Sequence, residues 1–295
     1  MMNKNSIISL IPKLAVLWLG FTLSINSQAE TVSVMPVQTA VPVEENLSSS
    51  VLLWMRADKP RQDSMQRWQG PHAQIIAANT DLKEYRQIHF AEHNTGLWQA
   101  IDGVETDIPT ERKIDGVADV TLKGHLSSQG EKQSQLAQAD EVNLFKRTIL
   151  YAAIPENSKR YRVANRNDVV NARSMVFIRK RPNISEHEFQ QFINQELAPS
   201  LANMEQLKEL RTAAYNPWQQ SQWNSPNVAH DNAPEVQFHG ALILGFADSQ
   251  AMSAFFQSDE LKQLSKRIAV FSSAIHAYNV EKTLVFIDNG RQVNP

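Results

Sequence analysis

The 295-residue chain contains no cysteine. Disulfide bonds, thiolate nucleophiles, thiolate metal sites and a lipidated N-terminal cysteine are therefore excluded. Glycine is scarce, with 10 residues, and the sequence has no Gly-rich phosphate loop, Gly-x-Ser-x-Gly elbow or His-Glu-x-x-His zinc motif. A basic surplus is also missing, because the formal net charge is −2. Since binding to phosphates requires a basic surface, nucleic acid is not expected as a partner.

The apolar run Leu14 to Ile25 is shorter than the roughly 20 residues that span a membrane. Lys4 and Lys13 precede this run, and the small residue Ala29 follows it. This order is typical of a secretory signal peptide, so we predict cleavage after Ala29, with an uncleaved membrane anchor as the alternative. Cleavage leaves 27 basic and 31 acidic residues, a net charge of −4. We expect a periplasmic or secreted protein with no membrane association after cleavage.

One stretch of the sequence occurs twice. Residues 82–90 read LKEYRQIHF and residues 207–215 read LKELRTAAY, an offset of 125 residues. The pairs Asp115-Gly116 and His239-Gly240 recur at nearly the same interval. This interval is too long for a solenoid, whose repeats run to about 50 residues, and it has the length of a small domain. The sequence therefore predicts a duplicated domain.

Each copy is expected to run strand, helix, strand, strand, helix, strand. In the first copy, hydrophobic periodicity predicts strands near 51–57, 82–90, 114–122 and 146–153, with helices near 64–78 and 129–139. In the second copy, strands are predicted near 174–180, 207–215, 236–246 and 277–287, with helices near 185–197 and 249–256. Pro71 predicts a break in the first helix, and Ser185 with Glu188 has the form of a capping box.

The predicted fold class is α+β. The chain is divided into a signal peptide (1–29), an extended segment (30–49), a first repeat (50–156), a polar linker (157–173) and a second repeat (174–290). An antiparallel sheet with both helices on one face leaves its other face uncovered. Two such sheets can cover each other, and we expect a barrel-like space between them.

This pattern resembles the EthD-type branch of the dimeric α+β barrel superfamily, whose units have the ferredoxin-like β-α-β-β-α-β fold. The resemblance rests on the motifs Trp68…Pro71-His72-Ala73, Phe192…Leu197-Ala198-Pro199 and Asp248…Phe255-Phe256, and on Glu281 in the closing strand. It covers most of residues 50–155 and 172–288. Single-domain members usually dimerise, so the tandem copies imply a monomer with an internal pseudo-dimer. Relatives include cyclases, isomerases, monooxygenases, haem-dependent enzymes and proteins of unknown role.

Candidate catalytic residues lie on the first copy of the repeated strand. Alternation places Tyr85, Gln87 and His89 on one face, with Lys83. Such a polar set is unusual for a central strand, so we interpret this face as pointing into the space between the sheets. The second copy has lost the phenol, the amide and the imidazole, so we place the site on the first copy. The alternative is that these groups are merely hydrogen-bonded on a half-exposed strand.

His72 is the other catalytic candidate. It lies four residues after Trp68 on the same helix face and belongs to the motif of the resemblance. An imidazole can accept or donate a proton at ambient pH, although a helix-end histidine bonded to backbone or solvent fits the pattern equally well. The candidate ligand-binding residues are Trp54, Trp68, Gln87 and Trp98. Two long loops, 94–112 and 216–234, carry tryptophans that anchor them or cover a pocket.

No metal site is predicted. His89 and His93 are four residues apart, which on a strand separates them by about 13 Å. The resemblance allows haem, for which His72, His89, His187 and His276 are the available axial ligands, but nothing in the sequence singles one out. A site without a cofactor is the leading expectation.

The leading functional hypothesis is an exported protein that binds a small apolar or aromatic molecule in the cavity between the sheets. Any reaction is expected to be cofactor-free acid–base chemistry of the cyclase, isomerase or dehydratase kind. In that reaction His72 and His89 transfer protons and Tyr85 donates a hydrogen bond. The competing hypothesis is a non-catalytic ligand-binding or stress protein, and a haem-dependent enzyme is a lesser alternative. A filled inter-sheet space favours a structural role for the duplication.

Overall fold

The structure is a computed structural model that describes residues 42–163 and 169–295. The predicted signal peptide, residues 1–29, and the part 30–41 of the expected extended segment lie outside the described residues. Within the described ranges, no helix is long and apolar enough to cross a membrane.

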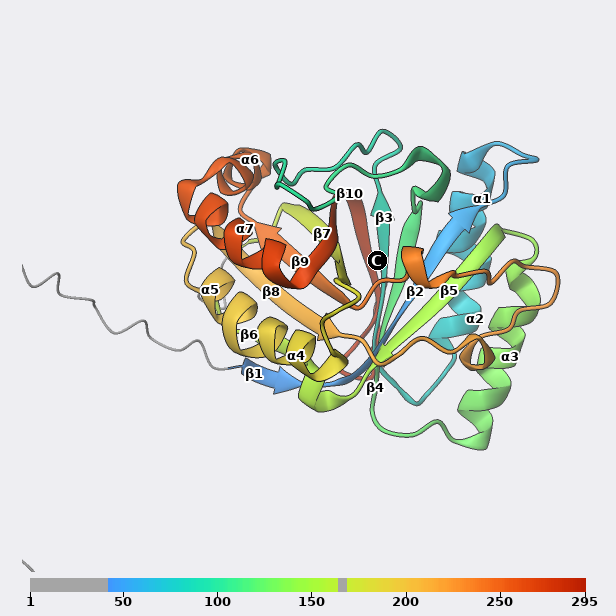
Figure 1. The fold of residues 1–295 in the computed structure, drawn as a ribbon. Helices are drawn as coiled ribbons and strands as arrows, with labels where there is room; N and C mark the ends of the chain where they lie inside the picture. Colours follow the sequence, from blue (N-terminus) through green and yellow to red (C-terminus); the bar gives the residue numbers. More distant parts are fainter. Residues whose placement is uncertain (1–41, 164–168) are drawn as a thin grey trace, which may run out of the picture. The chain divides into compact units, whose positions relative to one another are not determined.

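Residues 47–153 follow the predicted order of elements (Figure 1). Their strands are β2 (Leu47–Met55), β3 (Leu82–Phe90), β4 (Gly116–Leu122) and β5 (Phe145–Ala153). The helical segments are α1 (Arg61–Arg67), a π-helical turn (Trp68–His72), α2 (Ala73–Ala77) and α3 (Ser128–Glu141). The predicted helix break is confirmed, because Gly70 leaves the helical region with φ −104° and ψ −108° directly before Pro71.

Residues 172–288 repeat this order. The strands are β7 (Ala172–Lys180), β8 (Leu207–Ala214), β9 (Gly240–Phe246) and β10 (Ser272–Asp288). The helical segments are α4 (Glu186–Gln191), a π-helical turn (Phe192–Leu197), α5 (Ala198–Ala202), α6 (Ser249–Gln257) and α7 (Asp259–Phe271). The capping box at Ser185 and Glu188 is confirmed, whereas α7 is an additional helix that the sequence analysis did not expect.

Short elements lie outside this order. They are the strands β1 (Pro42–Glu45), β6 (Ser158–Tyr161) and β11 (Arg291–Gln292), and the 3-10 turns Thr110–Arg112, Pro155–Asn157, Gln220–Gln222 and Pro234–Val236. β6 lies where a linker was expected, and it pairs with both β1 and β8. The start of the expected linker is therefore part of the sheet.

The strands form one large antiparallel sheet in the order β1-β6-β8-β9-β7-β10-β3-β4-β2-β5. β10 joins the halves because its first part, to Val280, pairs with β7 and its second part, from Val280, pairs with β3. On the opposite side, β6 follows β5 after a short turn and pairs with β8. The last strand of each half, or its continuation, therefore pairs with the second strand of the other half.

Each strand of the first half divides its side chains between two layers. Val51 and Leu53 pack against the helices together with Trp68. The alternating residues Leu52 and Trp54 point the other way, into a cluster that both halves contribute. This alternation follows from the period of two along a strand. Because both faces are covered, both sets are apolar.

The space between the two halves is filled, which corrects the expectation of an open ligand cavity there. Its middle is occupied by stacked aromatic rings, with Phe90 4.4 Å from Tyr278 and Tyr151 4.9 Å from Tyr215 between ring centroids. Only small cavities of about 40 and 180 Å³ open at the two ends of β2 in this part of the described structure.

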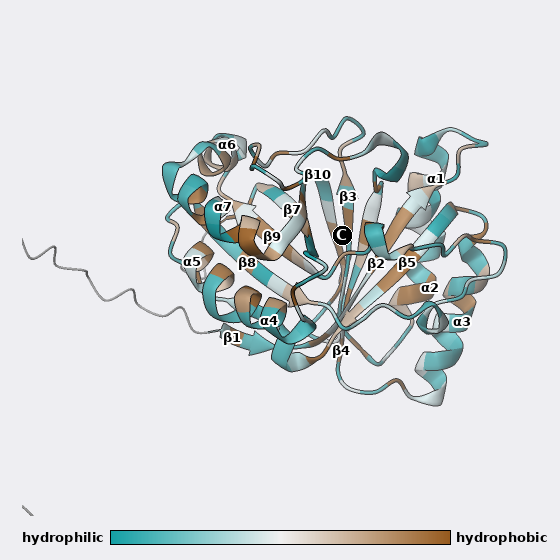
Figure 2. Cartoon of the chain, in the orientation of Figure 1, coloured by the Kyte–Doolittle hydropathy of each residue, from teal (hydrophilic) through white to brown (hydrophobic). Residues whose placement is uncertain are grey.

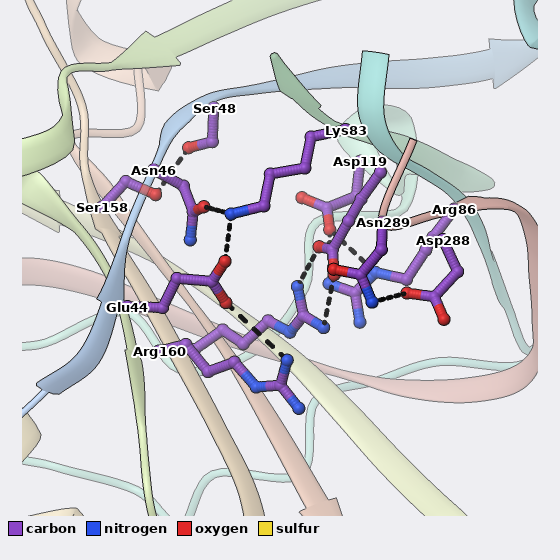
Figure 3. A network of polar contacts seen from close by, with 12 residues as sticks. Glu44, Asn46, Ser48, Lys83, Arg86, Asp119, Ser158, Arg160, Asp288 and Asn289 are labelled. Atoms are coloured by element: carbon purple, nitrogen blue, oxygen red, sulfur yellow. Dashed lines mark hydrogen bonds and ion pairs between the residues drawn. The ribbon is translucent and has the colours of Figure 1, made fainter. Parts of the chain in front are cut away.

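Ion pairs close the end at which β2 begins. Arg86 contacts Asp119 at 2.5 Å and Glu209 at 3.2 Å, and Glu209 also pairs with Arg173 at 2.7 Å. Figure 3 shows part of this network, in which Lys83 contacts Glu44 from β1. Burying charges is costly unless each has a partner, and here Asp119, Glu209 and Glu44 each pair with at least one cation. The network ties the two halves together.

Candidate functional site

A cavity of about 460 Å³ lies between α3 and the outer face of the first half of the sheet. Its walls are mostly apolar, with a few polar groups. The sheet contributes Val51, Leu53, Ala118, Val120 and Leu150; the first helical segment contributes Trp68, His72 and Ile76; and α3 contributes Gln133, Ala137, Gln138 and Glu141. A largely apolar cavity of this size with a few polar groups is typical of a site for a small molecule.

The composition of α3 explains why this layer is hollow. The helix reads SQGEKQSQLAQADE and is mostly hydrophilic (Figure 2). Ala137 is the buried apolar side chain that it directs inward, while Leu136 is half-exposed. A small side chain facing a sheet leaves space that no neighbouring atom fills.

The corresponding layer of the second half is filled. There the helices and the sheet contribute the buried rings of Phe189, Phe192, Phe246, Phe255 and Phe256. The two halves share their order of elements but differ in side-chain volume on the helix face. The cavity is therefore a property of the first half's sequence and not of the fold.

His72 and Asp140 form a hydrogen-bonded pair beside the cavity. Nδ1 of His72 lies 3.1 Å from Oδ2 of Asp140, and the histidine is 2% exposed. Burial opposes ionisation of Asp140, but hydrogen bonds from His72, Arg67 and Asn143 outweigh it and lower the pKa of the carboxyl well below its ordinary value. An ionised carboxylate only accepts hydrogen bonds. Nδ1 of His72 therefore carries the hydrogen, and its Nε2 makes no hydrogen bond with a described residue.

Glu141, the next residue, is a fully buried carboxyl on the cavity wall. Burial raises its pKa to about 7, against the hydrogen bonds that Ser225, Thr148 and Trp223 donate to it. Ser225 Oγ donates over 2.5 Å, Thr148 Oγ1 over 2.9 Å and Trp223 Nε1 over 3.1 Å. No lysine or arginine among the described residues pairs with Glu141. Its charge state therefore changes near neutral pH.

The long loop between β8 and β9 closes one side of the cavity. Trp223 lines the cavity and is fixed by its hydrogen bond to Glu141. Arg147 of β5 binds Asp231 over 2.7 Å, and Thr148 N donates to the carbonyl of Ala229. In Figure 1 this loop, in orange, runs across β5 towards α3. The second half therefore contributes a wall to the cavity of the first half.

Trp68 forms the other aromatic wall, and its position depends on Gly116. A Cβ atom at residue 116 would lie 2.7 Å from two atoms of the indole ring and 2.8 Å from the carbonyl oxygen of Ile88. The ring of Trp68 also stacks on His89 at 4.3 Å between centroids. The glycine that the sequence analysis noted in this strand thus permits close contact between helix and sheet.

The structure corrects the orientation predicted for the polar face of β3. Tyr85, Gln87 and His89 point towards the helices, whereas Arg86, Ile88 and Phe90 point into the space between the two halves. Gln87 Nε2 donates to the hydroxyl of Tyr85 over 2.7 Å and to the carbonyl of Trp68 over 2.8 Å, and Gln87 Oε1 lies 3.0 Å from Nε2 of His89.

None of these three side chains lines the 460 Å³ cavity. Burial, with smaller effects of Lys282 and Arg61, lowers the pKa of His89 to about 3. Burial likewise raises the pKa of Tyr85 well above its ordinary value. Both groups therefore stay uncharged near neutral pH, and their chain of hydrogen bonds supports Trp68 from below.

The predicted ligand-binding tryptophans are dispersed. Trp68 lines the 460 Å³ cavity, and Trp54 lines the smaller one of about 180 Å³ between the sheets. Trp98 packs in the core of the second half, where its Nε1 donates to Ser265 over 3.1 Å. Of the sequence candidates, the structure therefore brings only His72 and Trp68 together at the large cavity.

Sequence reasoning missed Asp140 and Glu141, whereas Trp223 lies in one of the two long loops whose tryptophans were expected to anchor the loop or cover a pocket. Asp140 and Glu141 directly follow the predicted helix 129–139. At this end of a helix, negative charge opposes the helix dipole. Two adjacent carboxylates at such an unfavourable place are a signal for hydrogen bonding to another element. The partner of Trp223 could not be inferred, because it lies 82 residues away in the chain.

Haem does not fit the residues of the large cavity. His72 could supply an axial nitrogen, but no lysine or arginine lines the cavity among the described residues, and the ionisable wall groups besides His72 are Glu131 and Glu141. The two propionates of a haem would lie among carboxylates. His89 is stacked on Trp68, His187 is exposed, and His276 lines the smaller cavity. Within the described residues, no group of three His, Asp or Glu side chains is placed to hold a metal ion.

No family model and no curated protein matches the sequence. Among solved structures, the fold is similar to an anthrone oxidase-like protein, with 8% identity over 83% of this chain and 95% of that chain and a TM-score of 0.49. It is similar to a proposed monooxygenase from Lactobacillus acidophilus, with 8% identity over 85% and 99% and a TM-score of 0.46. A mutant chlorite dismutase from Candidatus Nitrospira defluvii gives 6% identity over 81% and 93% and a TM-score of 0.43. With TM-scores below 0.5, these similarities assign no family.

Proposed function

We propose that this protein binds a small apolar, preferably aromatic, molecule in the cavity between α3 and the sheet, and that His72 exchanges a proton with it. The observation that carries the proposal is the placement of the His72–Asp140 pair on the wall of a 460 Å³ apolar cavity. A buried histidine oriented by a carboxylate is the arrangement that general acid–base catalysis uses. The reaction class is cyclisation, isomerisation or dehydration without a cofactor.

The cavity residues divide into three roles in this proposal. His72 is the catalytic residue, because Asp140 fixes its Nδ1 hydrogen and leaves Nε2 with a lone pair. Asp140 is a positioning residue that also stabilises the imidazolium once His72 accepts a proton. Glu141 holds Trp223 in place as a wall of the cavity. Tyr85 and His89 keep Trp68 in position and take no proton in the reaction.

A non-catalytic ligand-binding or stress protein is the second candidate. The observation favouring it is that both carboxylate oxygens of Glu141 already accept hydrogen bonds from the protein. Nε2 of His72 then remains a polar atom of the buried cavity wall that is free to bind a ligand. A single such group is enough to orient a ligand.

The decisive experiment begins with small molecules released from the denatured protein and identified by mass spectrometry. Analogues of the released compound are then assayed for turnover. His72→Asn is expected to bind the compound as the parent does and to lower kcat about 100-fold or more, since general acid–base groups contribute at least that much. Unchanged kcat in this variant sinks the catalytic proposal and leaves the binding proposal in place.

Further parts of the proposal concern architecture and location. The shared order of elements and the reciprocal pairing of β10 with β3 and of β6 with β8 support two tandem ferredoxin-like repeats, 50–156 and 174–290, closed as an intramolecular dimeric α+β barrel of EthD type. The protein acts as a monomer whose second copy replaces a partner subunit. It is exported after cleavage following Ala29. N-terminal sequencing of the exported protein tests the last point, with Glu30 as the expected first residue.

A further inference from the structure

The second cavity, of about 180 Å³, lies between the two halves at the end of β2 that is opposite the ion-pair network. It is separate from the cavity beside α3, and no residue lines both. Its apolar walls include the aromatic side chains of Trp54, Tyr151 and Phe238, beside aliphatic residues such as Leu52 and Ile149. A volume this far below that of drug-sized sites admits a ligand of about one ring.

Several polar groups of this cavity have no hydrogen-bond partner. Within the described residues, the guanidinium of Arg112 makes no hydrogen bond; its side chain is 22% exposed and forms an ion pair with Asp231 at 3.6 Å. Nε of Arg179 and Nε2 of His276 are buried without a hydrogen bond. Buried polar atoms without a partner are costly, since each forfeits its hydration. Nε of Arg179 is a donor, and Nε2 of His276 donates in one tautomer of the ring and accepts in the other. Their convergence on one small cavity indicates that an acceptor group belongs there.

One amide atom of Asn232 also lacks a partner. Asn232 is 5% exposed; its Nδ2 donates to the hydroxyl of Tyr151 over 2.8 Å, and its Oδ1 has no hydrogen bond. A hydroxyl group can serve either amide atom, because it both donates and accepts. A ligand that fits this cavity therefore carries a hydroxyl group in addition to a hydrogen-bond acceptor.

The charges around this cavity are arranged by depth. Glu111 and Glu235 are exposed at the rim, and Glu105 is occupied by Arg179, whose Nη1 donates to it over 3.1 Å. Glu105 also lies 3.5 Å from Nε2 of His276 without a hydrogen bond. Arg112 lies over the ring of Trp54 and Arg179 over that of Phe238, each 5.8 Å from the ring centroid. The inner part combines cations with aromatic faces, and the carboxylates lie outside or are already paired.

We propose that this cavity is a second binding site, for a small aromatic hydroxy-carboxylate. The carboxylate is held by Arg112 and Arg179, the ring lies against Trp54 and Phe238, and the hydroxyl bonds to Asn232. Arginine is suited to this task because its planar fork matches a carboxylate. The site is made by both halves of the chain, since Trp54 belongs to β2 and Arg179 to β7. It does not depend on the function proposed for the cavity beside α3.

The test is isothermal titration of the purified protein with 4-hydroxybenzoate. We expect saturable binding of one molecule, with at least about tenfold weaker binding of benzoate, which lacks the hydroxyl, and of 4-hydroxybenzamide, which lacks the charge. Arg112→Gln is expected to weaken 4-hydroxybenzoate binding about tenfold or more. Folding should be retained, because the substitution removes no hydrogen bond of the guanidinium and only its ion pair with the exposed Asp231, and exposed ion pairs contribute little to stability. The matched control is Arg291→Gln, at an exposed position near the C-terminus, which should bind as the parent does.

Ala137→Phe distinguishes the two cavities, since this substitution fills the one beside α3. The inference requires that Ala137→Phe still binds 4-hydroxybenzoate. Lack of saturation at about 10 mM probe, which would correspond to less than roughly 3 kcal/mol of binding free energy, overturns it. So does binding that Ala137→Phe abolishes and Arg112→Gln leaves unchanged, a result that would instead support the proposed function of the large cavity.

Discussion

The imidazole of His72 donates its Nδ1 hydrogen to Oδ2 of Asp140 over 3.1 Å, although the two residues lie 68 positions apart. The break at Gly70 and Pro71 lies inside the helical turn Trp68–His72 that carries His72, and Asp140 lies in the last turn of α3. Helix and sheet thus enclose a cavity whose one oriented imidazole is held by a carboxylate with a lowered pKa. The proposed function rests on this pair.

Replacing Asp140 by Asn is expected to lower the free energy of unfolding by about 2 kcal/mol at pH 7, since it weakens hydrogen bonds from His72, Arg67 and Asn143 to a charged acceptor. The pKa of Asp140 is lower in the folded state than in the unfolded state. The contribution of this carboxylate is therefore present above about pH 4 and is lost as the pH falls through the folded pKa. Urea unfolding at pH 7 and pH 3 measures both effects.

The matched control for Asp140 is Asp102, an exposed carboxylate in a loop. Asp102→Asn should leave the free energy of unfolding within about 0.5 kcal/mol of the parent. An equally small effect of Asp140→Asn would show that the pair with His72 is not formed in solution.

Glu141 predicts a pH dependence of the opposite sign. Burial raises its pKa from 4.5 to about 7, so the folded state holds a proton that the unfolded chain releases in this window. Stability should therefore fall as the pH rises from about 4.5 to 7, by roughly 3 kcal/mol in total. Glu141→Gln, which carries no titrating proton, is expected to remove this decline. Denaturant unfolding across the pH range checks it, with Glu131→Gln on the exposed start of α3 as the control.

An unaltered pH slope in Glu141→Gln would assign the decline to other groups. The same series reports on Trp223, whose Nε1 donates to Glu141. Its fluorescence should shift over the same pH window in the parent protein and stay constant in the variant.

Filling the cavity beside α3 is expected to be tolerated. Ala137→Phe places a ring into empty space, so the free energy of unfolding should change by less than about 1 kcal/mol. The control is Ala198→Phe in the packed layer of the second half, where Ala198 is 0% exposed. Overpacking there should cost about 3 kcal/mol. Thermal unfolding of both variants decides whether the hollow layer exists, because a cost as large at Ala137 as at Ala198 would rule it out.

Gly116 should resist substitution more than the unhindered Gly124. Gly116→Ala forces its Cβ against the ring of Trp68 and the carbonyl of Ile88, at 2.7 and 2.8 Å. We expect a loss of about 2 kcal/mol in the free energy of unfolding and a displaced Trp68. Gly124→Ala is the matched control, because no atom lies within 4 Å of its added Cβ. Similar stability of the two variants would contradict the close contact of Trp68 with the sheet.

The sequence predicted the strands of the two halves well, and the reason is visible in β3 and β8. The echoed stretches at 82–90 and 207–215 become Leu82–Phe90 and Leu207–Ala214. Each has the polar breaks before and after it that end a strand. The helix break at Gly70 was predictable for an equally local reason, since the ring of Pro71 disfavours the helical conformation of the residue before it.

The orientation of β3 could not be predicted in the same way. Alternation separates Tyr85, Gln87 and His89 from Arg86 and Ile88, but both faces of this strand are buried. One face meets helices and the other meets the opposite half, and the period of two is the same in either case. The polar character of the first set suggested a cavity, whereas the structure uses it for a hydrogen-bonded chain beneath Trp68.

The cavity itself depends on volume and not on pattern. The sequence of α3 predicts a helix with a polar face, and only the three-dimensional packing shows that Ala137 leaves a gap above Ala118 and Val120. The missed helix α7 is different, since Ser258 followed by Asp259 and Glu260 is a start signal that the sequence does contain.

The measurement that tests the central claim most directly is the release of bound molecules from the parent protein and from Ala137→Phe, compared by mass spectrometry after denaturation. If the cavity beside α3 is the functional site, the parent releases a small apolar or aromatic compound and the filled variant releases none. Equal amounts of the compound from both proteins would contradict this account, as would a parent protein that releases nothing.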